Sequence, residues 1–355
     1  MMNRTHTNAQ YPQPVEQVLE YLDLVVTRAL ARDPRQRYFW AVVQPRQASR
    51  QDEQYFLKVA FATPLVVTLL QREIQMLLTL RELGIPAVKV FAHNAEPDNV
   101  NYRFGLYELL EAEGRSGFAE TSVQRERLQS WHARAVVDTL CQFQDVNTER
   151  LASLRPSLHK FSWTFEEWYE QIVVNLNSPV APDASGDRPY PTLGDALRGA
   201  DDKPFTDQLL GFAASLEPAF KQRGSDLLIH GDCAPGNTFW REDGTAILLD
   251  WEWSGIAPTP WSLPAWGLDI ANYYTRAWEN PAFGHVLLKE YLHRKQDTEL
   301  NRLAIRAAFI DQTLNKLHPF YTYNEEYWQA TKAINRYKAI SAILYRAVTD
   351  TLFMD

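Results

Sequence analysis

The sequence predicts an α+β fold with a small β-rich N-terminal lobe and a larger helical C-terminal lobe. In the first third of the chain, stretches rich in aromatic and β-branched residues alternate with stretches of helical periodicity. The rest is mostly helical in its apolar spacing, and the 355 residues are enough for two ordinary domains. We place the N-terminal lobe at residues 1–110 and the C-terminal lobe at residues 111–355.

In the N-terminal lobe the pattern predicts a helix, two strands, a second helix and two further strands. Apolar residues recur at spacings of three and four from Val18 to Leu30, which is typical of an amphipathic helix. The second helix has Pro64 near its start and Gly84 just past its end, and both residue types are common at those positions. The segments, in chain order, are helix 15–32, strand 38–43, strand 55–60, helix 64–83, strand 87–93 and strand 102–109.

In the C-terminal lobe the pattern predicts long helices around two short apolar strands. The turn Asp243-Gly244 separates the strands, and four prolines and three glycines within 177–202 predict a long surface loop. The segments, in chain order, are helix 121–146, helix 162–176, helix 205–222, strand 227–230, strand 246–250 and helical sequence from 267 to the end.

The composition excludes several classes of protein. The 44 acidic and 36 basic residues give a net charge of −8 without a basic block, so we expect no nucleic-acid partner. No apolar run approaches the ~18 residues of a membrane span, and the polar N-terminus has no signal-peptide pattern. The two cysteines, Cys141 and Cys233, are too few for a zinc cluster and are typical of a reducing compartment. We therefore expect a cytoplasmic protein with no membrane partner.

Carboxylates follow both predicted strands of the C-terminal lobe. Asp232 comes just after the first strand and lies five residues before Asn237, and Asp250 ends the second strand. The intervening turn can fold the second strand back beside the first, which would bring Asp232, Asn237 and Asp250 to one point. An isolated aspartate would more often be a strand-end cap. Phosphoryl transfer from ATP, however, needs one carboxylate to accept the proton of the attacking hydroxyl, and it needs an amide oxygen and a second carboxylate to hold Mg²⁺.

The pattern His230-Gly231-Asp232-x4-Asn237, followed by an apolar strand ending in Asp250, resembles the aminoglycoside phosphotransferase and choline kinase-like families. These families are small-molecule relatives of the protein kinases, so the resemblance implies a two-lobed protein-kinase-like fold. It also implies that Asp232 is the catalytic base, that Asn237 and Asp250 bind Mg²⁺, and that His230 supports the loop.

The resemblance further implies a nucleotide site in the N-terminal lobe, with a sheet and a helix that bind ATP. Lys58 lies on a predicted strand, and in these families such a lysine contacts the α- and β-phosphates and pairs with a helix glutamate. Glu73 lies 15 residues later, on the following helix. Adenine would bind backbone groups near Glu108 and Leu110, where the last strand of the lobe leads to the second lobe. Three other charged residues compete with this assignment: Glu53, Arg72 and Glu82.

Two features depart from the family pattern. Where a glycine-rich loop should cover the phosphates, residues 33–37 contain no glycine. Either arginines or other backbone amides replace that loop, or nucleotide handling is altered. The helix that often ends in Leu-x-x-Leu-His in these families reads Leu140-Cys141-Gln142-Phe143-Gln144 here, which concerns a packing or substrate-loop detail.

Tryptophan is concentrated between residues 240 and 278, which hold six of the 11 in the chain. Aromatic faces there could stack on a sugar, a nucleoside or an amine, although large aromatic residues also fill cores. The candidates for the acceptor site are Trp253, Trp266, Asp269 and Tyr273, of which Asp269 also suits a helix cap or loop anchor. Glu252, two residues after Asp250, could bind a second Mg²⁺, orient the metal ligands or be a solvated charge.

The sequence as a whole indicates an ATP- and Mg²⁺-dependent phosphotransferase. Its acceptor would be a hydroxyl of a small molecule, such as an antibiotic, a sugar, a nucleoside or an amino alcohol. Residues 265–355 hold 10 acidic and 11 basic residues, a balance that does not favour a polycationic acceptor. One alternative is a protein Ser/Thr kinase, for which no activation segment is recognisable. The other is a pseudokinase that binds nucleotide without transfer, which the glycine-free segment favours.

Overall fold

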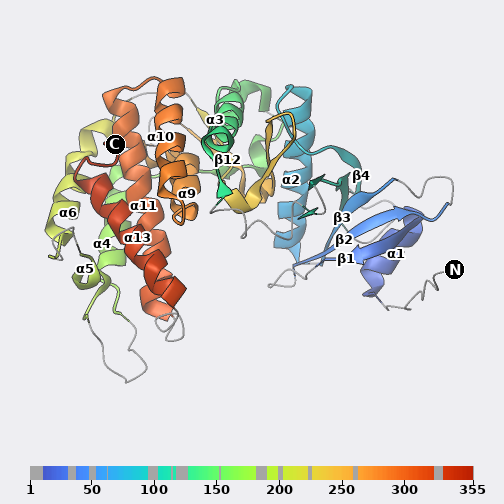
Figure 1. Ribbon diagram of the computed structural model, residues 1–355, viewed down its shortest axis with the longest axis horizontal. Helices are drawn as coiled ribbons and strands as arrows, with labels where there is room; N and C mark the ends of the chain where they lie inside the picture. Colours follow the sequence, from blue (N-terminus) through green and yellow to red (C-terminus); the bar gives the residue numbers. More distant parts are fainter. Residues whose placement is uncertain are drawn as a thin grey trace. The chain divides into compact units, whose positions relative to one another are not determined.

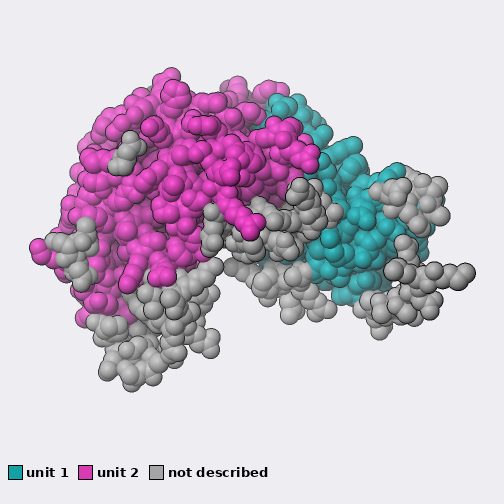
Figure 2. Space-filling model, viewed as in Figure 1, with its two compact units in different colours: residues 1–119 teal, residues 120–355 magenta. Residues whose placement is uncertain are grey.

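The computed structural model describes residues 11–30, 37–47, 53–61, 63–94, 103–112, 115–116, 127–151, 153–180, 190–198, 203–222, 226–258, 263–323 and 331–354. The chain separates into two compact units, residues 1–119 and residues 120–355, which are coloured teal and magenta in Figure 2. The first unit is built around a sheet and the second is mostly helical, so the predicted α+β class is confirmed.

A five-stranded antiparallel sheet forms the body of the first unit (Figure 1). The elements of this unit are α1 (Gln13–Tyr21), β1 (Leu24–Ala29), β2 (Tyr38–Pro45), β3 (Tyr55–Ala60), α2 (Pro64–Glu82), β4 (Val90–Asn94), β5 (Phe104–Glu108), β6 (Glu111–Ala112) and β7 (Arg115–Ser116). The sheet order is β1-β2-β3-β5-β4, and β6 pairs with β7 in a separate short hairpin.

The two faces of this sheet carry different side chains, because side chains alternate along a strand. On one face, Leu57 and Val59 of β3 join an apolar core with Val18 of α1. Lys58 lies between them in the sequence, so its side chain points to the opposite face, where it meets Glu73 of α2. The alternation therefore buries a single lysine of β3 against a helix.

Helix α2 forms where the sequence predicts it. The side chain of Thr63 accepts a hydrogen bond from the N–H of Val66, and Pro64 occupies the first turn. Gly84 follows the helix with a φ of +76°, a left-handed conformation that stops it. The strands predicted on either side of α2 are also present, with ends that differ by a few residues.

The helix predicted at 15–32 is wrong in its second half. Helix α1 ends at Tyr21, and Asp23 has a φ of +52°, which an α-helix cannot continue through. The residues that follow form β1, which pairs with β2. Val25 and Val26 fit the helical spacing, but they are β-branched and favour a strand once the chain has turned.

Helices make up most of the second unit (Figure 1). Its α-helices are α3 (Ser130–Gln144), α4 (Phe165–Leu176), α5 (Leu193–Ala196), α6 (Thr206–Ser215), α7 (Glu217–Phe220), α8 (Leu263–Trp266), α9 (Leu268–Arg276), α10 (Pro281–Lys295), α11 (Glu299–Tyr323) and α13 (Thr331–Val348). Its strands and 3₁₀ turns are η4 (Thr148–Leu151), η5 (Arg155–Ser157), β8 (His159–Lys160), β9 (Leu227–Ile229), η6 (Pro235–Asn237), β10 (Thr238–Trp240), β11 (Ala246–Leu248), η7 (Trp251–Trp253) and β12 (Gly255–Ala257). Among the helices described here, none is both long and apolar enough to cross a bilayer.

The predicted helices of this unit are present with shorter bounds. Residues 121–126 of the first one lie outside the described residues, and α3 begins at Ser130. The segment 205–222 forms two helices, α6 and α7, and the predicted loop 177–202 contains the short helix α5. The main core lies among α4, α6, α11 and α13.

The two short strands at 227–230 and 246–250 do not pair with each other, contrary to the sequence-based expectation. β9 pairs with β12, and β11 pairs with β10. The reason is local: β10 is separated from β11 only by a short turn, so the hairpin between them closes at little entropic cost. The carboxylate-bearing ends of β9 and β11 are instead joined by side chains.

Candidate active site

The loop after β9 carries the predicted catalytic aspartate. Gly231 has a φ of +84°, a left-handed conformation that glycine adopts without strain. A Cβ atom at this position would lie 2.4 Å from the carbonyl oxygen of Trp253, far inside van der Waals contact. Glycine is therefore required between His230 and Asp232 for the loop to pass this close to the backbone.

His230 ties this loop to the end of β11. Its imidazole is fully buried, with Nε2 3.0 Å from the carbonyl oxygen of Leu249. The N–H of Asp232 donates to Nδ1 at 3.2 Å, so Nδ1 is the acceptor and Nε2 carries the proton. Burial lowers the pKa of His230 to about 4, so the ring is neutral at neutral pH. This geometry is that of the loop support expected from the sequence.

Asp269 holds the same loop from the other side, at the start of α9. Its two carboxylate oxygens accept hydrogen bonds from the backbone N–H groups of His230 and Gly231, at 2.9 and 3.0 Å. The side chain has no exposed surface, and burial raises the pKa of its carboxyl group. The assignment of Asp269 to the acceptor site is therefore corrected: both oxygens are occupied by the loop backbone, and the residue is an anchor.

Asn237 joins the loop to the hairpin of β10 and β11. Its Nδ2 donates to the backbone oxygen and to the Oδ2 atom of Asp232, both at 2.9 Å. The backbone carbonyl oxygen of Asn237 accepts a hydrogen bond from the N–H of Leu249 at 2.8 Å, which continues the strand pairing beyond the Thr238–Leu248 pair. Because Leu249 precedes Asp250, this ladder sets Asn237 beside the residue that ends the second strand.

Asp250 and Glu252 bring two carboxylates together at the end of β11. Asp250 has left-handed backbone angles, φ +64° and ψ +59°, an uncommon conformation for a residue with a side chain. The 3₁₀ turn η7 follows, and carboxylate oxygens of Asp250 and Glu252 lie within 4.8 Å of each other. Trp251 between them is buried, and its Nε1 donates to the carbonyl oxygen of Leu248 at 2.9 Å. The packing of Trp251 into the core leaves its two acidic neighbours on a common side.

The first unit contains a buried ion pair between Lys58 and Glu73. The Nζ atom of Lys58 lies 2.5 Å from Oε2 of Glu73, and the two side chains are 5% and 7% exposed. The ammonium group also lies 4.3 Å from the centre of the Tyr38 ring. Of the competing carboxylates, Glu53 accepts a hydrogen bond from the hydroxyl of Tyr55, and Glu82 is exposed.

The end of β5, where adenine contacts are predicted, is tied to the residue before β4. The N–H of Glu108 donates to the carbonyl oxygen of Lys89 at 2.8 Å, and the Glu108 carboxylate accepts from the Lys89 N–H at 3.2 Å. The side chain of Leu110 is buried. Adenine binding at Glu108 and Leu110 stays a prediction. Residues 33–36 of the glycine-free segment lie outside the described residues.

Two aromatic candidates for the acceptor site differ in exposure. Tyr273 is fully buried, and its hydroxyl donates to Oγ1 of Thr238 at 3.2 Å. It cannot offer a face to an acceptor, so this assignment is corrected. Trp253 is 37% exposed and stacks on His159, with ring centres 5.3 Å apart and planes inclined by 12°. The role of Trp253 stays a prediction.

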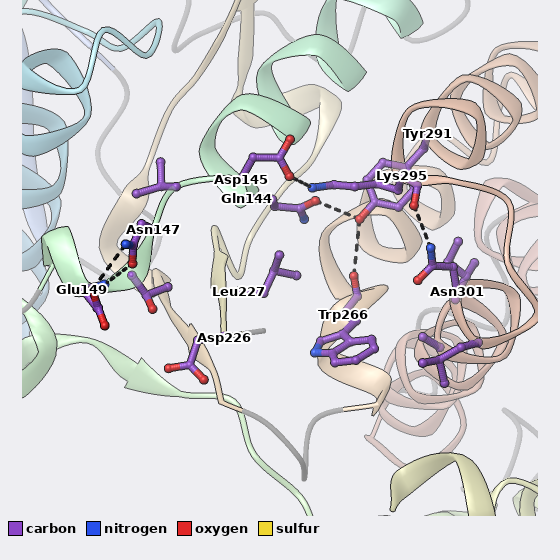
Figure 3. Close-up of a pocket in the computed structure, with 15 residues that line it drawn as sticks. Gln144, Asp145, Asn147, Glu149, Asp226, Leu227, Trp266, Tyr291, Lys295 and Asn301 are labelled. Carbon is purple, nitrogen blue, oxygen red and sulfur yellow. Dashed lines mark hydrogen bonds and ion pairs between the residues drawn. The ribbon is translucent and has the colours of Figure 1, made fainter. Parts of the chain in front are cut away.

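Trp266 faces a different cavity (Figure 3). This cavity of about 760 Å³ lies at the end of α3, beside α10 and the start of α11, and its lining includes Trp266, Gln144 and Tyr291. The Tyr291 hydroxyl donates to Oε1 of Gln144 at 2.8 Å on its wall. Asp232 does not line this cavity, and the role of Trp266 in an acceptor site stays a prediction.

Sequence reasoning missed two cations, of which Arg276 contacts the candidate base and Lys316 shares a partner with Arg276. The NH2 atom of Arg276 lies 2.5 Å from Oδ1 of Asp232, and its Nε donates to Oδ1 of Asn272 at 3.2 Å. Lys316 of α11 donates to the same Asn272 oxygen at 3.0 Å. A signal was present for Arg276, because Asp269, Asn272 and Arg276 recur at three and four residues and share one face of α9.

Comparisons with known proteins concern the family and the fold of the chain. The model of the phosphotransferase enzyme family (APH) matches residues 40–292. No curated protein matches the chain in sequence. Among solved structures, the chain is similar to an aminoglycoside phosphotransferase in complex with GDP and kanamycin, at 14% identity and a TM-score of 0.55, covering 95% of this chain and 98% of that one.

Two further solved structures extend the likeness. One is a microcompartment-associated aminopropanol kinase, at 15% identity and a TM-score of 0.53, covering 96% of this chain and 98% of that one. The other is an apoenzyme of a macrolide 2'-phosphotransferase from Brachybacterium faecium, at 15% identity and a TM-score of 0.52, covering 94% and 98%. At these identities the likeness concerns the fold, and it confirms the protein-kinase-like fold expected from the sequence.

Proposed function

This chain belongs to the phosphotransferase enzyme family, and on that premise we propose that it transfers the γ-phosphoryl group of ATP, with Mg²⁺, to a hydroxyl of a small molecule. The observation that carries the proposal is the pair of hydrogen bonds from Asn237 to Asp232. They link the candidate base to a candidate metal ligand. Phosphoryl transfer needs this link, because nucleophile and phosphate must be positioned together.

In the proposed reaction, Asp232 accepts the proton of the acceptor hydroxyl while the hydroxyl oxygen forms a bond to the γ-phosphorus. The bond between that phosphorus and the oxygen bridging to the β-phosphate breaks, and ADP leaves with the bonding pair. Asn237 contacts Oδ2 of Asp232 and Arg276 contacts Oδ1, so the carboxylate is oriented before the acceptor arrives.

The residues around Asp250 suit Mg²⁺. The available donors are the side-chain oxygen of Asn237 and the carboxylates of Asp250 and Glu252, and Mg²⁺ prefers such oxygen ligands. Asn237 donates through its nitrogen to Asp232, which turns its side-chain oxygen away from the base. When bound, Mg²⁺ would neutralise charge on the β- and γ-phosphates. We include Glu252 because one of its carboxylate oxygens lies within 4.8 Å of a carboxylate oxygen of Asp250.

Lys58 is the proposed ligand of the α- and β-phosphates in the first unit. Its buried pairing with Glu73 holds the ammonium group in one place, which lowers the entropic cost of binding a phosphate. Adenine is proposed to bind backbone groups at the end of β5, near Glu108 and Leu110.

Nucleotide binding and phosphate transfer test the proposal in two steps. The melting temperature of the protein is first measured with ATP, GTP and AMP, each with and without Mg²⁺, and we expect ATP with Mg²⁺ to raise it most. Transfer from γ-labelled ATP is then measured with pools of aminoglycosides, sugars, nucleosides, amino alcohols and hydroxy acids. We expect a labelled product in at least one pool, lost when Mg²⁺ is omitted.

The outcomes separate this proposal from its rivals. Stabilisation by ATP without a labelled product in any pool would support a nucleotide-binding protein that has no transfer activity. Neither stabilisation nor product would contradict the proposed function outright. Transfer to a protein serine or threonine, with none to small molecules, would favour a protein kinase.

A further inference from the structure

Two cations from different helices of the second unit lie beside the candidate base. Arg276 ends α9 and contacts Oδ1 of Asp232 at 2.5 Å. Lys316 lies on α11 and donates to Oδ1 of Asn272, which also accepts from Nε of Arg276. The side-chain oxygen of Asn272 thus lies between the two positive charges. One of these charges, on Arg276, contacts the Asp232 carboxylate that would receive the hydroxyl proton.

The partners of these cations do not balance their charge. Lys316 donates to Asn272 and to the side-chain and backbone oxygens of Gln312, at 3.0, 2.9 and 3.4 Å, and all three acceptors are neutral. Among the described residues Arg276 has one carboxylate partner, Asp232, which the reaction needs for the acceptor hydroxyl. A part-buried ammonium group such as that of Lys316, held by neutral oxygens, favours an anion nearby, because desolvation of its charge is otherwise uncompensated.

The other charged groups that act on Lys316 do not cancel this excess of positive charge. Burial, Arg276 and Arg336 lower the pKa of Lys316 to about 7, whereas Asp311 and Asp232 oppose the shift. Burial raises the pKa of Asp311 to about 6, so this carboxyl group holds its negative charge less firmly than an exposed one. Lys316 and the charged groups that act on it within the described part of the unit are thus three cations and two acids.

We propose that the acceptor carries an anionic group, a carboxylate or a phosphate, a few bonds from the hydroxyl that is phosphorylated, and that Arg276 binds this group with the positive charge of Lys316 beside it. The inference rests on the proposed function, because it assigns Asp232 to the hydroxyl. The short separation follows from the contact between Arg276 and Asp232: an anion on the guanidinium lies next to the base.

Binding of such an acceptor would also release the base. A carboxylate or phosphate forms paired hydrogen bonds with a guanidinium and competes with Asp232 for Arg276. The Oδ1 atom of Asp232 then becomes available to the acceptor hydroxyl. A cationic acceptor such as an amino alcohol would meet like charges at Arg276 and Lys316, so the same residues select against it.

Four matched probes test the inference on the full chain. They are 3-hydroxypropionate, 3-hydroxypropyl phosphate, 1,3-propanediol and 3-amino-1-propanol, which share a three-carbon chain and a primary hydroxyl and differ in charge. Dissociation constants are taken from the melting temperature against probe concentration, at constant ionic strength. We expect at least one anionic probe to bind about tenfold or more tightly than the diol and the amine. The two anions distinguish a carboxylate acceptor from a phosphorylated one.

Variants assign the preference to these two residues. The double variant Arg276→Gln/Lys316→Gln is expected to lose it, whereas Arg294→Gln is expected to keep it. Arg294 is a matched control, because it pairs with an aspartate, Asp138, at the same distance of 2.5 Å and is half exposed. If the double variant does not fold, the two single variants replace it, and the order of the four probes on the wild type decides in any case.

Equal binding of the four probes, tighter binding of the amine, or an anion preference that survives in the double variant would overturn the inference. Stabilisation by ATP and Mg²⁺ is measured on the same samples. An ATP response without an anion preference would reject the anionic acceptor and leave the proposed function standing. An anion preference without any ATP response would instead reject the proposed function.

Discussion

The two carboxylate oxygens of Asp232 face opposite kinds of chemistry. Oδ2 accepts from Asn237, which is linked through Leu249 to the acidic side of the site at Asp250. Oδ1 accepts from Arg276, which belongs to a basic corner built by two helices. We call these the metal side and the acceptor side. On this comparison one base is shared between a cation-binding half and an anion-binding half. Substitutions on the two sides should therefore impair different properties of the protein.

The largest effect is expected on the metal side. Asp250→Asn should lower the rate of phosphate transfer by about 10²–10³-fold, because it removes a charged ligand of the metal that stabilises the transferring group. Glu252→Gln should cost about tenfold. Initial rates across a Mg²⁺ titration measure both, and the two variants should need more Mg²⁺. Asp243→Asn, an exposed aspartate on the turn of the same hairpin, is the control. If Asp250→Asn needed no more Mg²⁺ than the wild type, the assignment of Asp250 to the metal side would be wrong.

A buried ion pair should respond differently from the part-buried pair at the base and from a pair on the surface. Lys58→Met removes the ammonium partner of the buried Glu73 carboxylate, which should destabilise the protein by about 3–5 kcal/mol in urea unfolding. Lys58→Met/Glu73→Leu should recover most of that stability without recovering transfer. Lys221→Met, which breaks an exposed pair with Glu217, should change stability far less than Lys58→Met. Equal losses for Lys58→Met and Lys221→Met would contradict the role of burial.

The neutral His230 predicts a pH dependence of stability. Its pKa is about 4 in the folded protein and 6.5 in the unfolded chain. Between these values the unfolded chain binds a proton that the folded protein does not, so the free energy of unfolding falls as the pH drops from 6.5 to about 4. The contribution should reach about 3 kcal/mol. His230→Gln keeps a donor for Leu249 and should remove this contribution, as unfolding curves across pH would show. If the free energies of unfolding of the wild type and of His230→Gln changed with pH in parallel, the contribution of His230 would be contradicted.

The smallest effect is expected for the acceptor-side ion pair in the absence of substrate. The side chains of Arg276 and Asp232 are 38% and 23% exposed, so Arg276→Gln should change stability by at most about 1 kcal/mol. Urea unfolding beside Arg294→Gln measures this. A loss as large as that of Lys58→Met would mean that Arg276 serves the fold, and the contrast between the two sides would then disappear.

The metal side was predictable from the sequence because its parts lie close along the chain. Asn237 lies five residues after Asp232, and a local hairpin carries the chain from Thr238 to Leu248 and so to Asp250. The pairing of the strands was mistaken, yet the predicted residues lie together, because His230 and Asn237 join the two strand ends through hydrogen bonds rather than through a shared ladder.

The acceptor side could not be predicted in the same way. Arg276 lies 44 residues after Asp232, and Lys316 lies 44 residues after Asn272. The contact of Lys316 depends on how α9 packs on α11, and that of Arg276 on how α9 meets the loop after β9, although the spacing of Arg276 marked its face of α9. Burial misled the prediction as well: Tyr273 is aromatic and near the motif in the sequence, but packing places it in the core. The helix predicted at 15–32 shows the same limit in its second half. The apolar spacing there fits a helix and a strand alike, and the chain leaves the helix at Asp23.

The central claim is that Asp232 accepts the proton of the acceptor hydroxyl between these two sides. Asp232→Asn tests it most directly, because the amide keeps the shape of the side chain and cannot accept that proton. The measurement is the initial rate of Mg²⁺-dependent transfer to an acceptor found in the pools, with stabilisation by ATP as the control for folding. We predict a rate lower by about 10²–10⁴-fold with unchanged ATP stabilisation. Transfer by Asp232→Asn within about tenfold of the wild-type rate would contradict the account.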